Sequence, residues 1–211
     1  MNNNTTTKTT TTTTTINDAA PTAQTDMVRV QTAVNKLNQS ADKDDLDAFI
    51  RGARRSILLV DVSFSMNDRI RAGGRKIDAL RKVVATLRDT HSVPVAAFGV
   101  NDSHNGVALI DEVPEPQGST PMDNAIDFGR EQGANHLVIV TDGQPNDEHR
   151  TLRAAQAFGN PIDVFYVGDG SGRDFARRLA TMTGGEFQNA DLGAIKQLAT
   201  GIRLMLGDGT N

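Results

Sequence analysis

From residue 55 onward, the chain alternates short apolar runs with stretches in which apolar side chains recur every three or four residues. Continuous apolar runs are typical of strands buried on both faces, and the recurring pattern is typical of amphipathic helices. Strands are predicted at 55–62, 93–100, 107–113, 136–141, 162–167 and 186–188. Helices are predicted at 76–87, 121–129, 147–158, 174–182 and 192–206.

This order of elements predicts the fold class. Strands that alternate with helices form a mostly parallel sheet covered by helices on both faces. Residues 101–106 have the composition of a turn, so the strands on either side of them are expected to pair as an antiparallel hairpin at one edge. The sequence therefore predicts an α/β fold, with a doubly wound, mostly parallel six-stranded sheet and an antiparallel edge strand.

The first part of the chain has a different character. Residues 1–25 are rich in threonine and contain almost nothing apolar, which predicts a disordered, solvated tail. A threonine-rich stalk that carries sugars or mediates assembly is the alternative. Residues 26–54 contain two short stretches with helical spacing, at 27–37 and 44–51. They predict a helical extension packed on the main domain, or else a partner-binding arm.

The main domain is expected at 55–206, followed by a C-terminal tail at 207–211.

The composition of the chain excludes several classes of function. The chain has 211 residues, with 22 Lys and Arg against 26 Asp and Glu, a net charge of −4. This mild acidity argues against a nucleic-acid or anionic-membrane surface. The absence of cysteine excludes disulfides, thiol catalysis and cysteine-type zinc sites. Without an apolar run of about 18 residues or a signal-like start, a cytoplasmic protein is expected.

Polar side chains follow two of the predicted buried strands and precede one helix. In open sheets of this kind, ligands bind beyond the carboxyl ends of the strands, where the strand order reverses. The residues that offer oxygen there are Asp61, Ser63, Ser65, Thr120 and Asp142. Hard oxygen ligands favour Mg²⁺, with Mn²⁺ as a substitute. Two carboxylates balance one divalent cation and leave a position for an oxygen donor from outside, such as a carboxylate of a partner.

Each fragment also has an ordinary structural interpretation. The Asp-x-Ser-x-Ser sequence is common in turns, where Asp and Ser bind their own backbone. Thr120 is also suited to cap the helix that begins at Pro121. If the site lies at the surface rim of the sheet, replacing Asp142 with alanine is expected to leave the fold largely intact.

The three fragments in this order resemble the metal-ion-dependent adhesion site (MIDAS) of von Willebrand factor A (vWA) domains, over about residues 55–206. The resemblance implies a Rossmann-like fold in which Ser63, Ser65 and Thr120 ligate the metal. It also implies that Asp61 and Asp142 act directly or through water. The family commonly has glycine between the two serines, whereas this chain has Phe64, and its segment after Met66 is longer than usual.

The sequence lacks residues and motifs that the enzymatic alternatives require. A haloacid-dehalogenase-type phosphotransferase needs a second carboxylate two residues after the first, where this chain has Ser63. The sequence contains neither a phosphate-binding P-loop nor a Gly-x-Ser-x-Gly nucleophile elbow. The histidines are scattered and expected at the surface: His91, His104, His136 and His149. The protein is therefore expected not to be an enzyme.

The function expected from the resemblance is a Mg²⁺-dependent interaction module that binds a Glu or Asp of a protein partner. Intracellular members of the family often work beside AAA+ ATPases of the MoxR type, so an adaptor of this kind is the first expectation. The second is a structural or assembly component of a larger particle, such as a virion or surface filament, tethered by the Thr-rich tail. A Mg²⁺-dependent hydrolase is the third.

Overall fold

A computed structural model describes residues 54–70, 73–90, 92–168, 170, 172–190 and 194–206. The predictions for the Thr-rich tail, for the helical extension up to residue 53 and for 207–211 lie outside the described residues. The strands are β1 (Ser56–Asp61), β2 (Val95–Phe98), β3 (Val107–Leu109), β4 (His136–Thr141), β5 (Ile162–Tyr166) and β6 (Phe187–Asn189). The helices are α3 (Lys76–Arg88), α4 (Met122–Glu131), α5 (Glu148–Phe158), α6 (Gly172–Thr183) and α7 (Ile195–Leu206), with short 3-10 turns at Phe64–Asn67 and His104–Gly106.

The strands form one sheet in the order β3-β2-β1-β4-β5-β6. All neighbouring strands are parallel except β2 and β3, which form the antiparallel hairpin at the edge. The chain leaves β1 toward β2 on one side and later returns to β4 on the other side. The order therefore reverses between β1 and β4, and their carboxyl ends form the crevice in which such sheets bind ligands.

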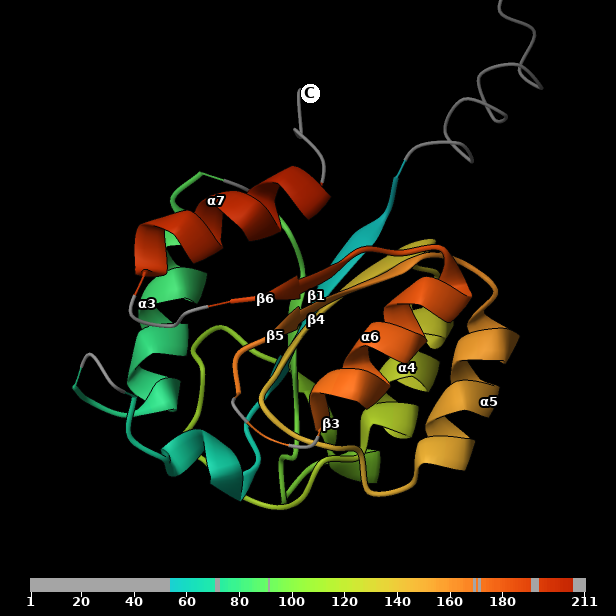
Figure 1. Cartoon of the computed structure of the whole chain (residues 1–211), viewed down its shortest axis with the longest axis horizontal. Helices are drawn as coiled ribbons and strands as arrows, with labels where there is room; N and C mark the ends of the chain where they lie inside the picture. Colours follow the sequence, from blue (N-terminus) through green and yellow to red (C-terminus); the bar gives the residue numbers. More distant parts are fainter. Residues whose placement is uncertain are drawn as a thin grey trace, which may run out of the picture. The chain divides into compact units, whose positions relative to one another are not determined.

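Helices cover both faces of the sheet, as Figure 1 shows: α3 and α7 lie on one face, and α4, α5 and α6 lie on the other. Side chains alternate between the faces along each buried strand. In β1, Leu58 and Val60 pack toward α3 and α7, whereas Ile57 and Leu59 pack toward the other three helices. Both faces of β1 are thus buried, which explains its uninterrupted apolar sequence.

The α/β fold predicted from the sequence is confirmed, including the six strands and the antiparallel edge. Element ends differ most at the strand predicted over 107–113, which stops at Leu109. Ile110 still donates its amide to the Val95 carbonyl, but the exposed Asp111 and Glu112 then lead the chain away from the edge. Val113 is buried under α3 instead, so its apolar character reflects loop packing and not strand pairing.

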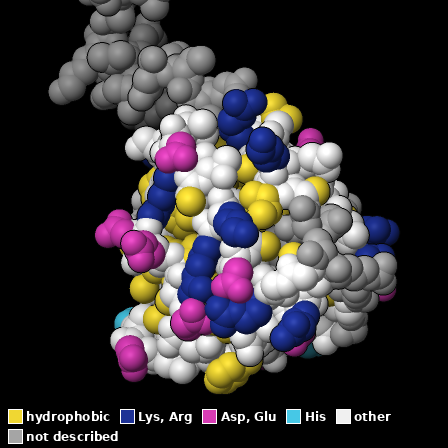
Figure 2. Space-filling model, turned by 90° about the vertical axis from the view of Figure 1, so that its left-hand side faces the viewer, with side chains coloured by type: hydrophobic (Ala, Val, Ile, Leu, Met, Phe, Trp, Pro, Cys, Tyr) yellow, Lys and Arg dark blue, Asp and Glu magenta, His cyan; other side chains and the backbone are white. Residues whose placement is uncertain are grey.

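The outer surface on the α3 side carries basic and acidic side chains intermixed, without a broad area of one sign (Figure 2). Among the described residues, no helix combines the length and the apolar character that crossing a membrane requires.

Candidate metal centre

Three loops meet beyond the carboxyl ends of β1 and β4. The Val62 amide donates to the Phe98 carbonyl at 3.0 Å, and Gln117 donates its amide to the Val62 carbonyl at 2.7 Å. Gly99 and Gly118 make this approach possible. Both have positive φ, and a Cβ on Gly118 would lie 2.5 Å from the Gly99 carbonyl oxygen.

The loop after β1 presents two hydroxyls toward one point. Asp61 Oδ1 accepts a 2.8 Å hydrogen bond from the Ser63 amide, which turns the chain back over the end of the strand. The turn at Phe64–Asn67 then brings Ser65 alongside, so that the Oγ atoms of Ser63 and Ser65 lie 3.1 Å apart. The turn expected of Asp-x-Ser-x-Ser, in which the Asp side chain binds the local backbone, is present. The same turn aligns the hydroxyls of Ser63 and Ser65.

Asp142 joins the same cluster from the end of β4. Its Oδ1 accepts a 2.6 Å hydrogen bond from the Ser65 hydroxyl. The carboxylate has no solvent exposure, although the sequence suggested a position at the surface rim. The reason is that side chains from the β1 loop and from the start of α3 contact both carboxylate oxygens and shield them from solvent.

Thr120 is brought to the cluster through Asn146. The Thr120 backbone amide donates to the side-chain oxygen Oδ1 of Asn146 at 3.0 Å. The Asn146 backbone amide donates in return to the Thr120 carbonyl at 3.0 Å. A Cβ on Gly143 would lie 3.8 Å from Ser65 Oγ and 3.9 Å from Thr120 Oγ1, so both hydroxyls flank this glycine. The structure thus brings together all five residues that the sequence selected. It places Thr120 at their edge.

Asp61 is built into the scaffold of the site. Its Oδ2 accepts a 2.6 Å hydrogen bond from the Thr141 hydroxyl, and the residue is fully buried. Burial, with the nearby charge of Asp142, raises the pKa of Asp61 to about 6 against the lowering effect of the hydrogen bonds from Thr141 and Ser63. The carboxylates of Asp61 and Asp142 are thus close enough for the charge of one to disfavour ionisation of the other.

Sequence reasoning missed Lys76, the first residue of α3. Its Nζ lies 2.6 Å from Asp142 Oδ2, 3.1 Å from Asp68 Oδ2 and 3.4 Å from the Ser65 carbonyl oxygen. The side chain is only 14% exposed. No local pattern marks this lysine, because it reaches the site only when α3 packs beside the β1 loop.

The donor set fits a small, hard cation. An octahedron with bonds of about 2.0–2.1 Å has edges of about 2.9 Å between neighbouring ligands. The 3.1 Å separation of the two serine Oγ atoms is close to this edge. The described residues contain no group of three or more His, Cys, Asp or Glu that could hold a metal ion, so such a site depends on its hydroxyls. Ser63, Ser65 and Thr120, with the two carboxylates, are the residues that would hold it.

The rim of the site is mixed in character. Phe64, between the two serines, is 67% exposed, which is unusual for a large aromatic side chain. Just before α3, Arg75 forms ion pairs with Asp78 at 2.8 Å and with Glu115 at 2.9 Å. Arg81 also contacts Glu115, at 2.9 Å. These pairs hold the start of α3 against the loop that carries Glu115.

One histidine does not lie where the sequence suggested. His136 is buried at the start of β4, where its Nε2 lies 2.8 Å from Asp163 Oδ2 and its Nδ1 lies 2.8 Å from Ser56 Oγ. The prediction of a surface histidine was wrong here because a buried imidazole is tolerated when both nitrogens are bonded. His136 starts β4, whereas the candidate site lies at the carboxyl end of that strand, so it takes no part in the site.

The comparisons with known proteins bear on the fold. No protein-family model matches the sequence, and no curated protein matches it significantly. Two structures of proximal thread matrix protein 1 (PTMP1) from the mussel byssus are similar, with TM-scores of 0.54 and 0.52 and sequence identities of 17% and 15%. The alignments cover 74% and 72% of this chain, which spans 48% and 45% of those proteins, or about half their length.

A further PTMP1 structure, with a zinc-occupied MIDAS motif, aligns over 71% of this chain at 14% identity, with a TM-score of 0.48. That alignment is too distant to carry an argument. At the identities of the two better matches, the likeness establishes the fold alone. The class defined in this way is a vWA-like Rossmann fold, with a hydroxyl and carboxylate cluster at its switch point.

Proposed function

We propose that this protein is a Mg²⁺-dependent protein-interaction module and not an enzyme. The observation that carries the proposal is the position of the Ser65 hydroxyl at the strand switch point, where its Oγ lies 3.1 Å from Ser63 Oγ and 2.6 Å from Asp142 Oδ1. Oxygen donors of this kind suit Mg²⁺ or Mn²⁺ better than softer metals.

The five residues of the site would have two roles toward the cation. Ser63, Ser65 and Thr120 would contact the cation, while the charges of Asp61 and Asp142 balance it. The bound cation would supply a centre of positive charge for a carboxylate of the partner. Mg²⁺ binds through few protein ligands and keeps several waters, one of which an acidic side chain can replace.

The partner surface that we propose combines an acidic and an apolar residue. Phe64 lies in the loop between the two serine ligands, and its side chain is exposed. An aromatic ring in this position gives an apolar contact to whatever approaches the cation, and aromatic residues are enriched where proteins bind each other. A Glu or Asp of the partner next to an apolar side chain would fit both features.

The biological setting rests on the family resemblance. An adaptor for an AAA+ ATPase of the MoxR type is our first proposal, and a component of a larger assembly is the second. Co-purification of an ATPase favours the adaptor, whereas stoichiometric presence in a particle favours the assembly role. Turnover of a generic phosphate ester that disappears in Ser63→Ala would instead favour a hydrolase.

Calorimetric titration of the metal-stripped protein with Mg²⁺ and Mn²⁺ tests the site itself. We expect saturable one-site binding in the wild type and its loss in the double variant Ser63→Ala/Ser65→Ala. The matched control is Ser92→Ala, an exposed serine away from the cluster, which should bind as the wild type does. Equal binding in the double variant would reject the assignment of the site.

A pull-down then tests the interaction. The full chain serves as bait, with either Mg²⁺ or a chelator present, and bound proteins are identified by mass spectrometry. We expect partners that require both Mg²⁺ and the two serines. Equal capture with chelator would show that the partner surface lies elsewhere.

A further inference from the structure

The ammonium group of Lys76 lies inside the candidate metal centre. Its closest neighbour is Asp142 Oδ2, at 2.6 Å, while Asp142 Oδ1 accepts from the Ser65 hydroxyl at 2.6 Å. The same carboxylate is therefore used on one side by a proposed metal ligand and on the other by a cation of the protein itself. The Asp142 carboxylate has no exposure, so this contact is shielded from solvent.

The contacts of Lys76 fill its hydrogen-bonding capacity. An ammonium group has three donors, and its three oxygen neighbours come from Asp142, Asp68 and Ser65. The group is thus a charged internal cation with no donor left for a partner.

We propose that Lys76 is a tethered competitor of the metal: its ammonium occupies the negative site around Asp142, and a divalent cation must displace it to bind. This inference rests on the proposed function and names how the site is regulated. Two cations on one carboxylate repel each other strongly in a buried setting. Lys76 and the metal therefore exclude one another.

Asp68 offers the displaced Lys76 ammonium a second counterion. Its side chain is 66% exposed and already lies 3.1 Å from Lys76 Nζ. The lysine can leave Asp142 by rotating about its flexible side chain while it keeps this second ion pair. The neighbouring Arg75 is held by Asp78 and Glu115, so it is not available to take the place of Lys76.

The exchange has a consequence for function. Without metal, Lys76 neutralises the buried Asp142 and keeps the cluster closed, so the apo domain needs no cation to stay folded. The metal binds only when its concentration overcomes the internal competitor. Partner binding then has a metal threshold that is set by Lys76 and not by the ligands alone.

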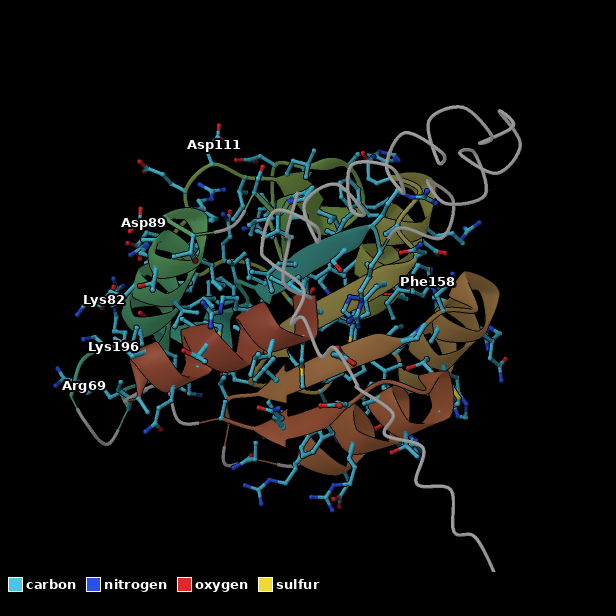
Figure 3. All side chains as sticks on the ribbon, turned by 90° about the horizontal axis from the view of Figure 1, so that it is seen from above. Arg69, Lys82, Asp89, Asp111, Phe158 and Lys196 are labelled. Carbon is cyan, nitrogen blue, oxygen red and sulfur yellow. The ribbon has the colours of Figure 1, made fainter. Side chains whose placement is uncertain are left out.

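The first test compares Lys76→Met with Lys82→Met in the full chain. Both variants remove one positive charge from α3, but Lys82 is exposed and extends away from the domain (Figure 3). Titration calorimetry at fixed pH and ionic strength gives the Kd for Mg²⁺ and for Mn²⁺. We expect Lys76→Met to bind each metal at least tenfold more tightly than both the wild type and Lys82→Met.

The second test needs no variant. A brief pulse of an amine-acetylating reagent, followed by mass spectrometry of the peptides, reports the reactivity of each lysine in the wild type. We expect Lys76 to be protected in chelator and to become several-fold more reactive at saturating Mn²⁺. Lys82 serves as the internal reference, and its reactivity should not change.

The outcomes separate the two proposals. The competition is overturned if Lys76→Met and Lys82→Met have the same Kd for the metal. It is also overturned if Lys76 stays protected from acetylation while the wild type is saturated with metal. In both cases the assignment of the metal site is unaffected. Binding of metal by none of the three proteins overturns both. Binding by Lys76→Met alone supports the competition in its strongest form.

Discussion

Asp61 and Asp142 end neighbouring strands, but their carboxylates are held in different ways. Asp61 accepts from the Ser63 backbone amide and from the Thr141 hydroxyl, which is fully buried and held in place by the Gly143 amide. Asp142 accepts from a serine hydroxyl and a lysine ammonium, which are both side chains that can rotate. Asp61 therefore shapes the loop, whereas Asp142 is the carboxylate whose partners can be exchanged.

Replacing Asp142 with asparagine should remove metal binding and also cost stability. Lys76 would keep its charge but lose its buried counterion, and breaking such a pair from one side is expensive. We expect the free energy of unfolding to fall by roughly 2–3 kcal/mol, because Asp68 compensates in part. This revises the expectation of an intact fold that follows from a site at the rim.

Urea denaturation of the metal-free protein measures the effect of Asp142→Asn. The control is Asp111→Asn, at an exposed loop position (Figure 3), for which we expect a change within about 0.5 kcal/mol. Equal stability of the two variants would mean that the Asp142–Lys76 pair contributes nothing to the fold.

Phe64 offers a prediction that separates the metal from the partner. The side chain is 67% exposed and supplies no metal ligand, so Phe64→Ala should leave the Kd for Mg²⁺ unchanged within about threefold. Partner binding should weaken by at least tenfold, which corresponds to about 1.4 kcal/mol. Exposed Leu204, on α7, provides the matched control as Leu204→Ala. Similar partner affinity for the two variants would remove Phe64 from the interface.

At the scale of elements, the amino ends of the strands are joined by a second polar cluster. Ser56 of β1 contacts His136 of β4, which contacts Asp163 of β5. Asp163 Oδ1 also accepts from the Glu186 amide before β6, at 2.8 Å, and the Ser56 hydroxyl donates to the carbonyl of Leu206 at the end of α7. The cluster thus connects four strand starts and the last helix at the end opposite the candidate metal centre.

Asp163→Asn should destabilise the domain in a pH-dependent way. Burial acts to raise the pKa of Asp163, but the hydrogen bonds from His136 and the Glu186 amide outweigh it and leave the pKa below its ordinary value. Ionised Asp163 therefore stabilises the fold above its ordinary pKa of 3.8, and this contribution is lost as the pH falls through the lowered pKa.

Chemical denaturation of the wild type and Asp163→Asn at several pH values measures this linkage. We expect a difference of about 1–3 kcal/mol at neutral pH that narrows below about pH 4. The exposed Asp102→Asn should show a small difference at every pH. A gap for Asp163→Asn that stays constant into acid would show that its charge contributes no stability.

At the scale of the whole molecule, the sequence predicted what depends on local pattern. Apolar runs such as that of β1 and the periodicity of α3 identified the elements, and parallel order implied that Asp61 and Asp142 meet at one edge. Lys76 and the depth of Asp142 could not be predicted in this way. They depend on how α3 packs beside two loops, and no residue in those loops encodes that packing by itself.

We expect the folded domain to require helix α7 but not residues 1–25. Both apolar clusters lie within the described residues from Ile57 to Leu206, with side chains from every helix of that region. Ordering a backbone costs about 1–2 kcal/mol per residue, and a threonine tract buries too little apolar surface to offset it. Deleting residues 1–25 should therefore shift the Tm by less than about 2 °C in calorimetry. Deleting 195–206 instead removes Leu198, Ile202 and Met205 from the core and should abolish the cooperative transition. A fall of many degrees on removing the tail would mean that the threonine-rich segment packs against the domain and takes part in its stability.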